Sequence, residues 1–155
     1  MTDLNEVFLS YNHDNRVLAG RVKQRLEKLG FAAFLAHEDI EVSEKWRSEI
    51  LKHLDSCSGM LAIVTENFSK SAWTNQEVGF LMGRNKPIVS LAFGIPTKSL
   101  PGLLEELQAI PDVSEASLEA ALDKAAKFLE TWKKPDSDSY FTQRSKEIYF
   151  HDWRR

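Results

Sequence analysis

The stretch Gly59-Met-Leu-Ala-Ile-Val-Thr65 decides the fold class of this 155-residue chain. Its apolar residues follow one another without alternating with polar ones, which predicts a strand that is covered on both faces. Such strands are typical of parallel sheets in α/β proteins, where helices lie on either side. The stretch therefore predicts a central strand of a parallel sheet.

Short apolar runs on either side of this stretch predict the other strands. They are Val7-Phe-Leu-Ser-Tyr11, Phe31-Ala-Ala-Phe-Leu-Ala36, Lys86-Pro-Ile-Val-Ser-Leu-Ala-Phe93 and, as a short edge strand, 108–113. Pro87 stands at the start of its run, where a missing N–H is tolerated.

Apolar residues at helical spacing occupy the segments between these runs. The predicted helices are 16–29, a helix that Ser43 caps, 69–84, and 114–133, which Ser114 caps. The alternation predicts an α/β, flavodoxin-like three-layer sandwich, with a parallel five-stranded sheet in the order 2-1-3-4-5 and helices on both faces. Ligands of such sheets bind at the carboxyl ends of the strands, here near the switch point between strands one and three.

The composition limits the classes of protein to which the chain can belong. Hydrophobic residues make up 43% and charged residues 28%, as in a globular protein, and the net charge of −3 predicts no nucleic-acid or membrane partner. Cys57 is the single cysteine and the four histidines lack ligand spacing, so no disulfide and no metal site is predicted. The start of the chain has no secretion-signal pattern and no apolar run can span a bilayer, which predicts the cytoplasm.

We expect one domain over residues 1–134, followed by a linker or tail over 135–155. Pro135 prevents the last helix from continuing. The tail mixes aromatic with basic residues, and two alternatives stay open for it. It packs back on the domain, or it leads to a second domain beyond this sequence.

Sequence motifs exclude several classes of α/β protein. The chain contains neither the GxxxxGK[ST] loop that cradles phosphates nor the GxGxxG turn that binds dinucleotides. A phosphoacceptor of the flavodoxin-like fold needs acidic residues after strand one and an Asp at the end of strand three. Here strand one ends in Ser10-Tyr11 and strand three is followed by Thr65-Glu66.

A carboxylate interrupts the apolar stripe of the predicted helix 69–84. Glu77 falls among Trp73, Phe80 and Leu81, and none of its neighbours three or four residues away is a cation. Placing a carboxylate against apolar groups costs free energy unless a polar or charged group pairs with it. Three alternatives stay open: the side chain reaches water at the edge of the stripe, another segment supplies a partner, or Glu77 faces a cleft and does chemistry there.

Four pieces of sequence resemble, in order and spacing, the TIR (Toll/interleukin receptor) domain family, and prokaryotic members most. Residues 7–11 resemble its opening strand, 34–40 with Trp46 and Ile50 its second strand and "BB" loop, and 56–67 its third strand. Ser71-Ala-Trp73 with Glu77 resembles the "S.W...E" helix. The resemblance covers residues 5–95 and extends to the helix that ends at Lys133.

The resemblance implies an activity and a site. In enzymatic TIR domains the helix Glu is the catalytic residue of an NAD⁺ glycohydrolase, which implies that Glu77 cleaves NAD⁺ to nicotinamide and ADP-ribose or a cyclic isomer. NAD⁺ is then the substrate, and no cofactor is implied. The residues expected to bind substrate are Ser10, Tyr11, Phe34, Leu35, Trp46 and Trp73. Core packing stays an equal alternative for Trp73 and the favoured one for Phe34, Ser10 has a backbone-capping alternative, and Trp46 is better placed to anchor its helix.

The family also implies self-association through TIR–TIR contacts, which activates many of its enzymes, and a role in antiviral defence in bacteria. A second class of function stays open, a non-enzymatic module that only binds other TIR domains. Many relatives carry an acidic residue where this chain has Ala36 and a Gly where it has Ser43, which favours the interaction module. Glu77 beside Trp73 favours the enzyme.

Overall fold

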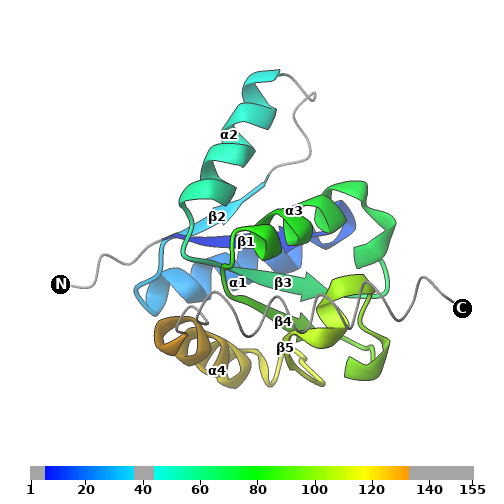
Figure 1. Cartoon of the computed structure of the whole chain (residues 1–155). Helices are drawn as coiled ribbons and strands as arrows, with labels where there is room; N and C mark the ends of the chain where they lie inside the picture. Colours follow the sequence, from blue (N-terminus) through cyan, green and yellow to red (C-terminus); the bar gives the residue numbers. More distant parts are fainter. Residues whose placement is uncertain (1–5, 37–43, 133–155) are drawn as a thin grey trace, which may run out of the picture.

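The computed structural model describes residues 6–36 and 44–132 and contains a five-stranded sheet (Figure 1). Its paired strands run parallel, in the order β2-β1-β3-β4-β5. The strands are β1 (Val7–Tyr11), β2 (Ala33–Leu35), β3 (Gly59–Val64), β4 (Ile88–Ala92) and β5 (Gln108–Ile110). This order confirms the predicted α/β, flavodoxin-like fold. The predicted loop at 37–43 and tail at 135–155 lie outside the described residues.

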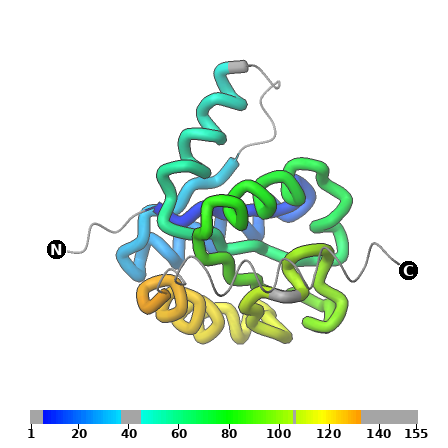
Figure 2. The backbone as a smooth tube through the Cα atoms, in the orientation of Figure 1, coloured from blue at the N-terminus to red at the C-terminus, as the bar shows by residue number. Residues whose placement is uncertain are grey.

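Helices cover both faces of the sheet and complete a three-layer sandwich. The described α-helices are α1 (Arg16–Lys28), α2 (Glu44–Ser56), α3 (Ala72–Gly83) and α4 (Leu118–Thr131). Short 3-10 helices cover His13–Asn15, Phe68–Lys70, Thr97–Ser99 and Gly102–Glu106. Buried residues of α1 and α4 form a core on one face, and those of α2 and α3 form a core on the other. Figure 2 shows that α2 stands out from the body of the domain, beside β2.

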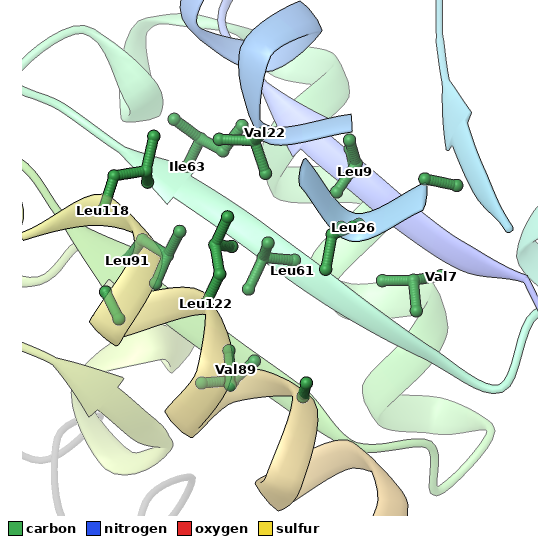
Figure 3. Close-up of a cluster of buried hydrophobic side chains, with 14 of the residues drawn as sticks. Val7, Leu9, Val22, Leu26, Leu61, Ile63, Val89, Leu91, Leu118 and Leu122 are labelled. Atoms are coloured by element: carbon green, nitrogen blue, oxygen red, sulfur yellow. The ribbon is translucent and has the colours of Figure 1, made fainter. Parts of the chain in front are cut away.

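The central strand explains why the sheet needs helices on both sides. In β3, Leu61 and Ile63 pack with α1 and α4 (Figure 3), whereas Met60, Ala62 and Val64 pack with α2 and α3. All residues of β3 are buried, as the unbroken apolar run predicted. Because strand side chains alternate between faces, every residue of this run reaches one core or the other.

The boundaries of several elements differ from the prediction. The helix α4 begins at Leu118 and not at Ser114. The Ser117 N–H donates to the Ser114 carbonyl oxygen at 3.2 Å, and the Ala121 N–H donates to the Ser117 carbonyl oxygen at 2.9 Å. Residues 114–117 therefore form a turn before the helix, and the prediction that Ser114 caps it was wrong. The strands β2 and β5 are also shorter than predicted, because each lies at an edge and pairs on one side only.

Lys86, between α3 and β4, closes the carboxyl-terminal end of α2. Its Nζ donates to the backbone carbonyl oxygens of Leu54, at 3.1 Å, and of Asp55. Carbonyls in the last turn of a helix lack intrahelical partners and attract cations. We therefore expect Lys86→Met to lower the free energy of unfolding by about 1–2 kcal/mol in urea titrations. The control Lys127→Met, an exposed position on α4, should change it by less than about 0.5 kcal/mol, and equal losses would contradict this assignment.

Candidate functional site

Glu77 lies on the face of α3 that packs against the sheet. Its side chain is 4% exposed and shares this face with Thr74, Val78 and Leu81. The Thr74 hydroxyl holds the start of the helix, because its one hydrogen is shared between the backbone carbonyl oxygens of Phe68, at 2.6 Å, and Ser71, at 2.9 Å. The carboxylate is therefore carried by a helix whose first turn is held in place by buried hydrogen bonds.

A cleft of about 590 Å³ opens between α2 and α3, and Glu77 lies in its wall. The residues that line it are Arg47, Ile50, Leu51 and Leu54 of α2, with Ala72, Trp73, Gln76, Glu77 and Phe80 of α3. Most of this lining is apolar, and the volume lies within the range of small-molecule sites. The geometry thus places a buried carboxylate beside a cavity large enough for a ligand.

Two tryptophans stand together at this part of the fold. Trp46 of α2 and Trp73 of α3 contact edge to face, with ring centroids 5.2 Å apart and an interplanar angle of 84°. Both side chains are half-buried, and Trp73 lines the cleft. Trp73 therefore has one contact with another ring and also a surface on the cavity, so packing and ligand contact are compatible for this residue.

The other residues expected at the site lie elsewhere in the sheet. Ser10 is fully buried and shares the sheet face of α2 and α3. Tyr11 and Leu35 belong to the core of α1 and α4 on the opposite face, and the Tyr11 hydroxyl donates to the carbonyl oxygen of Ala36 at 2.5 Å. Phe34 packs on Phe8, with ring centroids 5.4 Å apart, and stacks on the imidazole ring of His53, with centroids 3.6 Å apart. None of these four lines the cleft of Glu77.

Polar side chains link the loops at the switch point between β1 and β3. The Asn12 Nδ2 donates to the Asn67 carbonyl oxygen at 2.6 Å, and the Thr65 hydroxyl donates to Asn15 Oδ1 at 2.8 Å. The Asn12 Oδ1 in turn accepts a hydrogen bond from the backbone N–H of Asp14 at 3.0 Å. These bonds tie together the edge at which a ligand was expected, whereas Glu77 faces the cleft between α2 and α3.

Comparison with known protein families matches residues 7–126 to the TIR domain. The chain belongs to the TIR domain family. The match spans every strand described above and reaches into α4, so the fold and the cleft both lie within the matched region of this TIR domain. No curated protein matches the chain.

Solved structures share the fold of this TIR domain at low sequence identity. A 2-deoxyribosyltransferase from Bacillus psychrosaccharolyticus is 19% identical, with a TM-score of 0.52, and the match covers 73% of this chain and 95% of that one. Clostridium botulinum CMP N-glycosidase is 16% identical, with a TM-score of 0.53 and coverage of 78% and 98%. A TIR-STING receptor from C. gigas is 17% identical, with a TM-score of 0.55 and coverage of 94% and 52%.

The single cysteine of the TIR domain is buried and carries a protonated thiol at neutral pH. Cys57 is 2% exposed, and burial raises the pKa of its thiol from 9.0 to about 11, while the nearby Lys86 lowers it in part. Its Sγ donates to the carbonyl oxygen of Leu54 at 3.3 Å. A thiol in this state is a poor nucleophile at neutral pH.

The raised pKa of Cys57 gives a pH dependence with a defined sign. Between pH 9 and 11 the unfolded chain releases a thiol proton that the folded chain retains, so the stability falls as the pH rises through this window. We expect the free energy of unfolding of the wild type to fall by roughly 2 kcal/mol relative to Cys57→Ala over that range. Parallel pH profiles for the two proteins, from denaturant unfolding, would contradict the shift.

Sequence reasoning missed the contribution of α2 to the cleft. Trp46 and Ile50 were singled out from the sequence, but Arg47 and Leu51 were not, although 47, 50, 51 and 54 share one face of a helix. That spacing was the available signal, because the 51% exposure of Leu51 is known only from the structure. Within residues 6–36 and 44–132, no cluster of His, Cys, Asp and Glu side chains suits a metal ion, and no helix is long and apolar enough to cross a bilayer.

Proposed function

We propose that this TIR domain is an NAD⁺ glycohydrolase in which Glu77 is the catalytic residue. The observation that carries the proposal is the position of the Glu77 carboxylate, buried on the wall of a ligand-sized cleft beside Trp73. The chain belongs to the TIR domain family, and the resemblance of Ser71-Ala-Trp73 with Glu77 to the "S.W...E" helix of its enzymatic members implies the same role for Glu77. Two structures with the same fold are named as a 2-deoxyribosyltransferase and an N-glycosidase, which is compatible with chemistry at a glycosidic bond.

The proposed reaction breaks the bond between the nicotinamide nitrogen and C1′ of the ribose. The electron pair of that bond leaves with nicotinamide and neutralises its pyridinium, while positive charge develops on the ribose. A carboxylate fixed next to C1′ stabilises this charge, and it does so more strongly in an apolar cleft than in water. Water then adds to C1′ and loses a proton, which gives ADP-ribose, or a hydroxyl or ring nitrogen of the same molecule adds and gives a cyclic isomer.

The apolar lining of the cleft suits the leaving group. Nicotinamide is flat and aromatic, and Trp73 and Phe80 offer aromatic surfaces beside the carboxylate. Ile50 and Leu54 are 2% and 3% exposed and close the inner wall against water. Because nicotinamide departs as a neutral molecule, the proposed cleavage requires no separate acid to protonate it.

Self-association is part of the proposal, as is a role in bacterial antiviral defence. We expect the full chain to release nicotinamide from NAD⁺, with a rate per molecule that rises with protein concentration. Chromatography with mass detection identifies nicotinamide and distinguishes ADP-ribose from a cyclic isomer. Absence of nicotinamide at every concentration, including on a surface that crowds the protein, would reject the proposal.

The second candidate function is an interaction module that binds other TIR domains without catalysis. The observation that favours it is an apolar surface between α2 and α3, where Leu51, at 51% exposed, lines the cleft with the half-buried Trp73 and Phe80, because a surface formed by several apolar side chains can mark a contact site. Sedimentation of the wild type and of Leu51→Glu measures association, and NAD⁺ cleavage is measured on the wild type alone, because Leu51 also lines the cleft. The interaction module would be favoured if the wild type associates but cleaves no NAD⁺, and if Leu51→Glu disrupts that association.

A further inference from the structure

A second hollow, of about 600 Å³, adjoins the cleft of Glu77 between α2 and α3. Arg47, Leu51 and Phe80 line both hollows, so the two are continuous. The second hollow is also lined by Ser48, Lys52, Asp55 and Arg84. A molecule whose reacting part lies at Glu77 can therefore extend into this second hollow along the groove between the two helices.

Positive charge exceeds negative charge in the second hollow. Asp55 is the acidic residue in the lining of this hollow, and it forms an ion pair with Arg84, whose Nη2 lies 3.3 Å from the Asp55 Oδ1. The Arg84 guanidinium also lies over the Phe80 ring, with Cζ 5.1 Å from the centroid. Arg47 and Lys52 make no ion pair with another described residue, and both are exposed. Two cations are thus available to a ligand next to the cleft of Glu77.

The chemistry of a dinucleotide fits this arrangement. The ribose that carries nicotinamide at C1′ carries the diphosphate at C5′, so a diphosphate must lie within one sugar's length of the catalytic carboxylate. Arg47 lines both hollows, so it lies on the path from the cleft of Glu77 to the second hollow. Cations at this point also offset the repulsion between Glu77 and an anionic substrate.

We propose that Arg47 and Lys52 bind the diphosphate of the substrate and make the site selective for dinucleotides over nucleosides such as nicotinamide riboside. This inference rests on the proposed function and adds the residues that select its substrate. The planar guanidinium of Arg47 can bind two phosphate oxygens at once, and Lys52 acts as a point charge about 1.4 turns further along α2. Ser48 lines the same hollow and carries a hydroxyl that can donate a further hydrogen bond.

The experiment measures binding separately from turnover. The full chain carrying Glu77→Gln is titrated with ADP-ribose by calorimetry, alone and with Arg47→Gln and Lys52→Gln added. We expect these two changes to raise the Kd for ADP-ribose at least tenfold, and inorganic pyrophosphate to compete with ADP-ribose. The control adds Lys28→Gln and Lys127→Gln, two exposed positions on α1 and α4, which remove the same charge on the other side of the sheet and should change the Kd less than twofold.

Each outcome bears on the diphosphate site. An unchanged Kd in the Arg47→Gln and Lys52→Gln protein, equal weakening in the control, or no binding of ADP-ribose at all would overturn it. A wild type that fails to cleave NAD⁺, but whose ADP-ribose affinity depends on these two cations, would reject the glycohydrolase and keep the site. A wild type that cleaves NAD⁺ with a KM that Arg47→Gln and Lys52→Gln do not raise would keep the glycohydrolase and reject the diphosphate site.

Discussion

Replacing Glu77 by Gln is expected to lower the rate of nicotinamide release from NAD⁺ on the order of a thousandfold. Gln has the shape of Glu and can still form hydrogen bonds, but it carries no negative charge to stabilise a positive ribose. Because the side chain is 4% exposed, water cannot replace that charge readily. The circular dichroism spectrum should be unchanged, so the loss is one of chemistry and not of folding.

The matched control for this prediction is Glu130→Gln. Glu130 is exposed on α4, which packs on the opposite face of the sheet from the cleft, and the change removes the same charge. The control should cleave NAD⁺ at the wild-type rate in a steady-state assay with nicotinamide quantified by chromatography. Equal rates for wild type and Glu77→Gln would remove Glu77 from the mechanism, and equal losses in both variants would point to a general effect of charge.

Leu61→Ala is expected to lower the free energy of unfolding by about 3 kcal/mol. Leu61 is fully buried at the centre of β3, between Leu9 of β1 and Val89 of β4, and its loss leaves a cavity in the core of α1 and α4. For a domain of this size the melting temperature should fall by roughly 6–12 °C. Calorimetry or thermal denaturation followed by circular dichroism measures the change.

The control for Leu61→Ala removes the same atoms from the surface. Leu29 follows α1 and is 44% exposed, so Leu29→Ala should cost less than about 1 kcal/mol. Well below its melting temperature, Leu61→Ala should keep the wild-type rate of NAD⁺ cleavage, because its side chain faces away from the cleft of Glu77. A loss of activity in folded Leu61→Ala protein would mean that the two faces are coupled.

The fold follows from short-range features of the sequence. The unbroken apolar run at 59–65 predicts a strand buried on both faces, and parallel connections through helices leave few possible strand orders. The order and the buried character of β3 were predicted correctly for this reason. The start of α4 was predicted wrongly, because Ser114 and Ser117 are both possible N-caps and only the backbone geometry decides between them.

The site was harder to derive than the fold. Glu77 was singled out because a carboxylate stood in an apolar stripe, and the structure places it beside a cleft. The opposite wall of that cleft depends on how α2 docks, and periodicity within one helix does not specify its position against another. Arg47 and Leu51 were therefore missed, and Tyr11 and Leu35 were assigned to substrate although their side chains belong to the core of α1 and α4.

The most direct test of Glu77 as the catalytic residue is a crystal structure of the Glu77→Gln protein with NAD⁺. We expect NAD⁺ in the cleft between α2 and α3, with C1′ of the nicotinamide ribose facing the side chain at position 77 and the diphosphate beside Arg47. NAD⁺ bound elsewhere, with the cleft empty or its C1′ turned away from position 77, would contradict it.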